Sequence, residues 1–289
     1  EIASEFRYSE SPLYEDDLFI AISQSGETAD TLAAVKLAKE KEIPVIALCN
    51  VMGSSVAKAA DAVLYTLAGP EIAVASTKAY TTQVLLLQLL ASYLGERLKG
   101  QSEVEQQRIL SALWDLPRQA QSLLGEGQIG FIQRMANQFF DCKSVFFIGR
   151  GLDWATAQEA ALKLKEISYI HSESYAAGEL KHGTIALVEP GTLVVALATQ
   201  NKVREKMLSN VEEVRARGAR ILLLLPAEAE KAAEVFGDRA ELLTLPDSAA
   251  YGYSILSIIP MQLFSCFMAL EKGCDIDKPR NLAKSVTME

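Results

Sequence analysis

The chain has 289 residues, of which 49% are apolar and 22% are charged, and its net charge is −9. This length and composition are typical of a globular protein with about two domains, and they exclude disordered and collagen-like chains. The acidic balance argues against nucleic acid or an anionic membrane as a partner. No secretory signal is evident, and no apolar run approaches the ~20 residues that span a bilayer, which predicts a soluble, cytoplasmic protein.

Four cysteines are scattered along the chain without a C-x-x-C pair, and only two histidines accompany them. This usage excludes a disulfide framework and a zinc site, and it is typical of the reducing cytosol. We therefore expect free thiols and no metal. The chain begins with a glutamate and not with methionine, which suggests that it is part of a longer protein.

Strand and helix patterns alternate through the first hundred residues. The apolar runs that predict strands are residues 18–23, 45–48 and 62–66. The segments with helical spacing of apolar residues are 28–41 and 81–98. This alternation is typical of a parallel sheet covered by helices, so we predict an α/β domain over residues 1–100.

A polar segment with helical periodicity follows at residues 101–141, and we interpret it as a helical connector that Pro117 breaks. A second α/β domain is predicted over residues 142–274. Its apolar runs are residues 144–149, 193–197 and 221–225. Residues 275–289 form a tail without regular amphipathic character, of a kind that normally frays.

The two predicted domains share a repeat. Residues 20–48 align without a gap with residues 196–224, at an offset of 176. The alignment pairs Ser23 with Thr199 and Gln24 with Gln200, and it superimposes strand, loop, helix and strand. Chance could produce a similar apolar pattern, but the glutamine shared at the loop favours duplication. We therefore predict two copies of one α/β domain.

A hydroxyl-rich loop, SQSGET at residues 23–28, lies between a predicted strand and a helix N-terminus. Free N–H groups and the positive end of the helix dipole attract anions there, at the edge of the sheet where ligands bind. The loop has no lysine and no G-x-x-x-x-G-K pattern, so a phosphate monoester fits better than a nucleotide. The alternative is that Ser25 or Thr28 merely caps the helix.

The second copy of this loop reads TQNKVRE and lacks both the serine pair and the glycine. The first copy therefore holds more hydroxyls than capping requires. A second hydroxyl-rich turn, ASTK at residues 75–78, precedes the long helix and could reach the same ligand through Ser76. Capping is again the alternative for this turn.

Glu159, Lys163 and Glu166 are spaced i, i+4 and i+7, so they line one face of a predicted helix over residues 159–169. Such spacing usually indicates a solvated row of ion pairs. Here apolar neighbours leave little room for a polar face, which predicts that the charges are partly enclosed. A carboxylate beside a lysine in a half-buried cleft can act as a base.

Two further residues are candidates for proton transfer and covalent chemistry. His182 lies in a segment between glycines, predicted as a polar loop, and histidine is the usual proton-transfer group near neutral pH; a structural histidine is the alternative. Lys284, in the tail, is either a solubilising charge or an amine that forms a Schiff base with a carbonyl substrate.

Four segments together resemble the glucosamine-6-phosphate synthase family, also called glutamine–fructose-6-phosphate aminotransferase (isomerising). They are SQSGETADT at 23–31, EIAVASTKAYTTQ at 71–83, ALKLKEISYIHSESYAAGELKHG at 161–183 and DKPRNLAKSVT at 277–287. The resemblance runs from end to end. It implies two tandem sugar-isomerase (SIS) domains, each a five-stranded parallel sheet of order 2-1-3-4-5 between helices.

The resemblance also implies roles for the residues. The tail lysine, Lys284, would form an imine with fructose 6-phosphate, and Glu166 would move the proton between C1 and C2, supported by Lys163 and Glu159. His182 would assist ring opening from a neighbouring subunit, which implies a homodimer. The residues that would hold the sugar phosphate or lie beside the sugar are Ser23, Gln24, Ser25, Thr28, Val74, Ser76 and Ala283. No pyridoxal phosphate or other cofactor is implied.

Two parts of the family pattern are missing from this sequence. The first is the glutaminase domain, which supplies glutamine-derived ammonia. The second is the first strand of the first SIS domain with its C-G-T-S loop, so the chain is expected to begin in the second strand. Because the missing strand is central, its loss leaves backbone groups unpaired and an apolar slot open. The second SIS domain is expected to be complete.

We therefore predict the sugar-isomerase part of an amino-sugar biosynthetic enzyme that converts fructose 6-phosphate to glucosamine 6-phosphate with ammonia. One alternative is a non-catalytic sugar-phosphate-binding regulator, which would need the phosphate loop but neither Glu166 nor Lys284. Another is a phosphosugar isomerase without amination.

Overall fold

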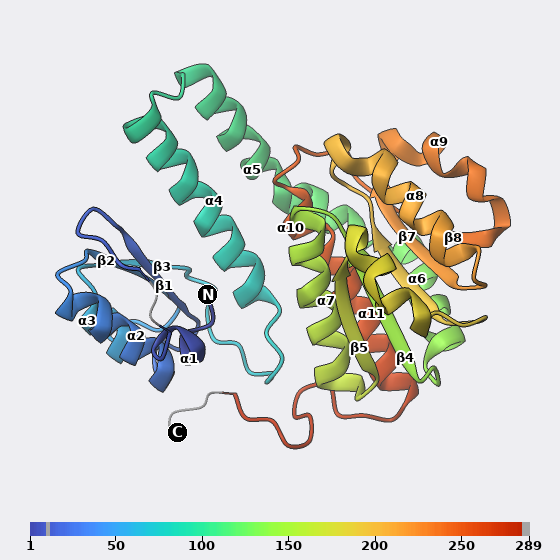
Figure 1. Cartoon of the computed structure of the whole chain (residues 1–289), viewed down its shortest axis with the longest axis horizontal. Helices are drawn as coiled ribbons and strands as arrows, with labels where there is room; N and C mark the ends of the chain where they lie inside the picture. Colours follow the sequence, from blue (N-terminus) through green and yellow to red (C-terminus); the bar gives the residue numbers. More distant parts are fainter. Residues whose placement is uncertain (10–11, 285–289) are drawn as a thin grey trace. The chain divides into compact units, whose positions relative to one another are not determined.

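A computed structural model describes residues 1–9 and 12–284 of the chain. The chain forms two compact units, each built around its own parallel sheet (Figure 1). Unit 1 comprises Glu1–Leu90 together with the tail from Asn281, and unit 2 comprises Ala91–Arg280. The division falls inside helix α4 (Lys78–Lys99).

Unit 1 contains three parallel strands in the order β1-β2-β3, and all three were predicted. The strands are β1 (Phe19–Ser23), β2 (Val45–Cys49) and β3 (Ala62–Tyr65). The helices are α1 (Ala3–Phe6), α2 (Ala29–Glu40), α3 (Ser55–Ala59) and the start of α4. The apolar face of α2, with Val35 and Ala38 fully buried, packs over the central strand β2 and forms the core of the unit.

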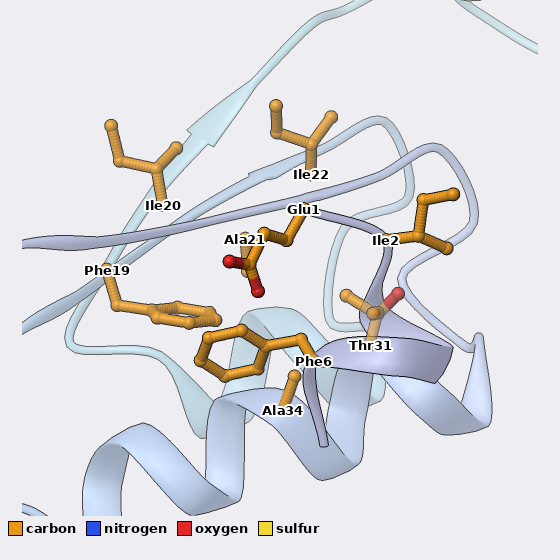
Figure 2. A pocket seen from close by; sticks show the side chains of 10 residues that line it. Glu1, Ile2, Phe6, Phe19, Ile20, Ala21, Ile22, Thr31 and Ala34 are labelled. Carbon is orange, nitrogen blue, oxygen red and sulfur yellow. The ribbon is translucent and has the colours of Figure 1, made fainter. Parts of the chain in front are cut away.

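One edge of this sheet is open. Within the described residues β1 pairs only with β2, and Ile20 and Ile22 are 37% and 44% exposed. A hollow of about 480 Å³ lies along the strand, and Figure 2 shows Phe6 and Phe19 at one side of it and Ile20 and Ile22 on the opposite face of β1. This open, apolar edge is what the sequence predicted for a sheet without its central strand.

The prediction that the chain begins in a strand was wrong. Residues Ala3–Phe6 form the short helix α1, and the carbonyl oxygen of Ile2 accepts hydrogen bonds from the N–H groups of Glu5 (3.1 Å) and Phe6 (2.9 Å). A strand needs a neighbour to pair its backbone groups, whereas a helical turn satisfies them locally. The ring of Phe6 packs 5.3 Å from that of Phe19 and anchors the turn on β1.

Unit 2 contains five parallel strands in the order β5-β4-β6-β7-β8, which is the predicted 2-1-3-4-5 order. The strands are β4 (Ser144–Gly149), β5 (His171–Ala176), β6 (Leu193–Leu197), β7 (Arg220–Pro226) and β8 (Ala240–Leu245). The inner strands β4, β6 and β7 are almost wholly buried, which explains why they read as continuous apolar runs.

Helices α7 and α8 pack against the sheet of unit 2. The helices of the unit are α5 (Glu103–Leu123), α6 (Glu126–Phe139), α7 (Leu152–Ser168), α8 (Arg204–Arg215), α9 (Glu230–Ala233), α10 (Tyr253–Leu256) and α11 (Ile258–Glu271). Five short 3₁₀ segments lie in the connections between β5 and β8: η1 (Ala177–His182), η2 (Thr184–Leu187), η3 (Asn201–Val203), η4 (Ala227–Ala229) and η5 (Glu234–Arg239). Helix α11 packs against both α7 and α6.

The predicted repeat is confirmed. Adding 176 to the bounds of β1, α2 and β2 places them on β6, α8 and β7 to within two residues. The counterpart of β1 is therefore β6, which pairs with β4 on its other side. Unit 1 has no strand at that position among the residues that the structure describes.

Pro117 does not break the connector, contrary to the prediction. It lies inside α5, and the helices α5 and α6 separate only at Leu124 and Gly125. A proline removes one backbone N–H from a helix and normally kinks it. Here Leu113, Leu116 and Leu123 are buried on one face of α5, so packing on both sides of the proline keeps the helix continuous.

Two other predictions need correction. The segment around residues 175–183 is not a loop, because β5 runs to Ala176 and η1 follows it. The prediction that no apolar stretch approaches the length of a membrane span was also wrong. The helical stretch Tyr253–Glu271 is long and apolar enough to cross a membrane by length and composition. Of that window, 61% is buried inside the structure, and a core helix passes the same test. It is therefore weak evidence for a membrane span.

Candidate functional site

The hydroxyl-rich loop begins at the carboxyl end of β1. Ser23, the last residue of the strand, is buried, and its Oγ accepts a hydrogen bond from the N–H of Gly26 at 3.0 Å. The same Oγ lies 3.3 Å from Oγ1 of Thr28. The loop thus folds back on the end of the strand and leads directly into α2.

The alternative that these hydroxyls only cap the helix does not hold for Thr28. Thr28 occupies the N-cap position of α2, but its side chain makes no capping hydrogen bond. The Oγ of Ser25 accepts from the N–H of Glu27 at 3.2 Å, a contact within the loop. The loop therefore presents hydroxyl and amide groups at the positive end of a helix dipole, as an anion site requires.

Gly26 is required by the packing of this loop. Its φ is +65°, and a Cβ atom at this position would lie 2.1 Å from Oγ of Ser54. The neighbouring carboxylate of Glu27 accepts hydrogen bonds from the N–H (2.9 Å) and Oγ (2.6 Å) of Ser55 and so ties the loop to α3. Cys49 lies beneath, where burial raises the pKa of its thiol.

A cleft of about 550 Å³ opens beside the loop within unit 1. Residues from the carboxyl ends of β1 and β2, from the segment after β3 and from the tail line it. They are Gln24, Ser25, Asn50, Val51, Met52, Leu67, Gly69, Pro70, Glu71 and Lys284. The predicted phosphate loop and the predicted imine lysine, 259 positions apart (284 − 25), therefore share one cleft.

Lys284 is held at the wall of this cleft. Its Nζ donates a hydrogen bond to the carbonyl oxygen of Ala73 at 2.6 Å and lies 3.4 Å from Oε2 of Glu71. Val74 and Ser76 lie on the same turn as Ala73 and are half-buried, and Ala283 immediately precedes the lysine. In the described part of the tail, the lysine side chain is not a solubilising charge, since only 29% of it is exposed.

The acid–base residues of α7 form a separate cluster in unit 2. The Nζ of Lys163 lies 2.7 Å from Oε2 of Glu166 and 3.3 Å from Oε1 of Glu159. The lysine side chain is only 5% exposed, and the two carboxylates are 21% and 15% exposed. The prediction of partly enclosed charges is confirmed, and a solvated row of ion pairs is excluded.

His182 differs from this cluster in its exposure. It ends η1, its side chain is 74% exposed, and its Nε2 lies 3.9 Å from Oε2 of Glu179. His182 is therefore not a core residue of unit 2.

In the second copy of the loop, which begins at Thr199, a side chain of the protein already accepts hydrogen bonds from the backbone N–H groups. The carboxylate of Asp153, which is 3% exposed, accepts hydrogen bonds from the N–H groups of Thr199 (2.7 Å) and Gln200 (3.3 Å) and from the Thr199 hydroxyl. Burial raises the pKa of Asp153 although these donors oppose that rise. An internal carboxylate thus takes the place that an anion would take, and the loop in unit 1 is the open copy.

Sequence reasoning missed two residues of the cleft. Glu71 stands within the EIAVASTK segment, but no local pattern distinguishes it from an exposed charge. Asn50 follows β2, and its side chain accepts from the N–H of Ala68 (2.9 Å) and donates to the carbonyl oxygen of Gly69 (2.8 Å). A polar residue directly after a buried strand, at the edge where ligands bind, was a usable signal.

The four cysteines are free thiols, as predicted. Among the described residues, no three histidine, cysteine, aspartate or glutamate side chains come together as metal ligands.

Comparison with known proteins places these features in a family. The SIS domain model matches residues 1–93 and 138–272. The chain is 53% identical over its whole length to a glutamine–fructose-6-phosphate aminotransferase (isomerizing) from Caldanaerobacter subterraneus subsp. tengcongensis, and 52% identical to one from Symbiobacterium thermophilum. It spans about half of each relative, 47% of the length.

A solved structure gives the same result. The C-terminal domain of glucosamine-fructose-6-phosphate aminotransferase from Francisella tularensis is 37% identical, with a TM-score of 0.92. The match covers 96% of this chain and 78% of that chain.

The packing of Gly26 predicts a specific sensitivity of the loop. Gly26→Ala should lower the free energy of unfolding by about 2–4 kcal/mol, because it adds a clash with Ser54 to the strain of a left-handed conformation. Gly53→Ala is the matched control, since Gly53 has φ +70° but open space around its Cβ position, and should lose only about 1 kcal/mol. Equal losses in chemical denaturation would contradict the steric argument.

Replacement of Asp153 tests the occupied loop. Asp153→Ala leaves the buried N–H of Thr199 without its acceptor and should lower the free energy of unfolding by about 2–4 kcal/mol. The control Asp247→Ala removes an exposed carboxylate that accepts one N–H, from Glu228, and should change stability by less than about 1 kcal/mol. A loss no larger than the control's would show that Asp153 does not hold this loop.

Proposed function

This chain belongs to the SIS domain family, and we propose that it is the sugar-isomerase part of a glucosamine-6-phosphate synthase that binds fructose 6-phosphate. The observation that carries the proposal is the shared cleft of unit 1, in which Lys284 lies with the hydroxyl-rich loop. The names of the relatives, which join glutamine and fructose 6-phosphate, support the choice of substrate. A cleft of about 550 Å³ is of the size that holds a small ligand.

In the proposed complex, the loop residues Ser23, Gln24, Ser25 and Thr28 bind the phosphate together with Ser76. Val74 and Ala283 lie beside the sugar. Backbone N–H groups at the start of α2 and the hydroxyls supply donors, and the helix dipole favours the negative charge. The phosphate thereby orients the sugar carbonyl within the cleft.

Lys284 then condenses with the ketone at C2 of the open-chain sugar. The ammonium and the ketone give a protonated imine and one water molecule, and the positive charge stays on the lysine nitrogen, which is now the imine nitrogen. Ammonia adds to C2 and expels the Lys284 amine, so that an imine of ammonia remains at C2 and the lysine is free again. The electron-withdrawing imine makes a C1 proton acidic, and Glu166 removes that proton and returns it at C2, with Lys163 and Glu159 holding its carboxylate in place.

For the complete protein we propose glutamine-derived ammonia as the amino donor and glucosamine 6-phosphate as the product. We also propose a homodimer, in which the exposed His182 assists ring opening in the partner's site, and a cytoplasmic location. The scheme needs the lysine of this chain and no pyridoxal cofactor.

Borohydride trapping tests the imine. With fructose 6-phosphate and borohydride, mass mapping should find a reduced sugar adduct on Lys284, and Lys284→Ala should abolish it. Adducts spread over several surface lysines, or none while the sugar phosphate still binds, would contradict the enzymatic proposal and favour a sugar-phosphate-binding regulator.

Glu166→Gln tests the proton transfer. It should reduce isomerisation by at least about 100-fold, because a positioned acid–base group typically contributes that much, while sugar-phosphate affinity and Lys284 trapping persist. The control is Glu212→Gln, which removes an exposed carboxylate paired with Arg215 on α8 and should leave turnover unchanged. Unchanged turnover in Glu166→Gln would remove Glu166 from the mechanism.

A further inference from the structure

Glu71 is a buried carboxylate at the wall of the cleft to which neither the motifs nor the proposed chemistry assigns a role. It lies in the segment between β3 and α4, and its side chain is only 4% exposed. Its Oε1 accepts hydrogen bonds from the N–H (2.7 Å) and Oγ1 (3.2 Å) of Thr77. Its Oε2 is directed to Lys284 Nζ, 3.4 Å away. The carboxylate is therefore anchored on one side and faces the reactive amine on the other.

Lys284 contacts two acceptors that are two residues apart on this segment. The carbonyl oxygen of Ala73 accepts from Nζ at 2.6 Å, and the Glu71 carboxylate lies beside it. Burial raises the pKa of Glu71, but hydrogen bonds from Thr77 and the charge of Lys284 outweigh it and bring the pKa below its usual value. Glu71 is thus an anion at neutral pH.

We propose that Glu71 is a positioning residue for Lys284 and the counter-ion of its protonated imine; this inference rests on the proposed function. Condensation of the ammonium with the ketone releases water and leaves one positive charge, which moves no further than the nitrogen of the same side chain. The fixed carboxylate holds Nζ in one position for attack on the ketone and stabilises the positive charge of the imine that forms. The carbonyl oxygen of Ala73 accepts the one N–H that the imine retains.

A purely structural role for Glu71 makes a different prediction. In that case the carboxylate only holds Thr77 at the start of α4, and its loss lowers stability without changing the chemistry of Lys284. The rate of imine formation, measured beside the affinity for the sugar phosphate, distinguishes the two roles, because a residue that only holds Thr77 would not slow trapping on Lys284 while binding persists.

The test uses Glu71→Gln in the full chain, with fructose 6-phosphate and borohydride as the probe. The amide keeps the shape and an acceptor for Thr77, but it carries no charge and presents N–H groups to Lys284. Trapping on Lys284 should slow about 10- to 100-fold, the effect of one charge-assisted hydrogen bond. Sugar-phosphate affinity, measured by calorimetry, should change less than about twofold, since the phosphate loop keeps its donors.

Asp61→Asn is the matched control. Asp61 also pairs with a lysine, Lys39, and accepts a backbone N–H, that of Val45 at 2.8 Å, but it lies outside the cleft of unit 1. Its trapping rate should equal that of the unsubstituted chain. Glu71→Asp, which restores the charge with a shorter reach, should recover part of the rate.

The possible outcomes distinguish a failure of the role of Glu71 from a failure of the proposed imine chemistry. A Glu71→Gln variant that traps on Lys284 at the original rate overturns the role of Glu71, and so does an equal slowing in Asp61→Asn. If the unsubstituted chain binds the sugar phosphate but gives no adduct on Lys284, the proposed function itself fails, and the role of Glu71 fails with it.

Discussion

The contact between the Lys284 amine and the segment after β3 is the interaction on which the candidate site depends. The tail that carries the lysine has no regular secondary structure between residues 274 and 284, so backbone hydrogen bonding within the tail does not hold it in place. Earlier in the tail, the N–H of Arg280 donates a hydrogen bond to the Tyr169 hydroxyl. The lysine amine itself is held by the carbonyl oxygen of Ala73 and the carboxylate of Glu71.

Duplication of one α/β unit explains how an open candidate anion site and a filled counterpart exist in the same chain. Both copies retain a strand, a loop and a helix N-terminus, which together produce free N–H groups at the carboxyl edge of the sheet. In unit 2 the Asp153 carboxylate accepts those donors. In unit 1, hydroxyls and a glycine surround the position, and a cleft opens beside it. The two loops share the same succession of strand, loop and helix. They differ in whether a side chain of the protein already accepts hydrogen bonds from the N–H groups of the loop.

In both units, a buried charged side chain contacts a side chain of opposite charge. Lys163 is almost completely enclosed, and two carboxylates contact it. Glu71 is equally enclosed, and a lysine and a backbone N–H contact it. Removing one partner of Lys163 or Glu71 leaves a buried charge without compensation. Single substitutions of these partners are therefore informative. A buried ion pair of this kind is better evidence for a chemical role than for stability.

The alternation of apolar runs and helical spacing predicted the strands of unit 1, three strands of unit 2 and the repeat, because burial on both faces makes parallel strands continuously apolar. The hydroxyl-rich loop and the spacing of Glu159, Lys163 and Glu166 were equally visible, since both are local patterns. The strand β5, rich in polar residues, and β8 were missed, and Pro117 was wrongly read as a break, because neighbouring strands and helix packing decide those segments.

The sequence by itself determined the α/β class, the duplication, the candidate reactive side chains and the family that their motifs resemble. Only the tertiary structure decided that Lys284 enters the cleft of unit 1, that Glu71 faces it, and that Asp153 fills the second loop. Local sequence reports secondary structure because periodicity and turn chemistry act over a few residues. Contacts between residues more than 200 positions apart, such as Glu71 and Lys284, depend on how the chain returns to the same sheet edge, and no local pattern encodes that return.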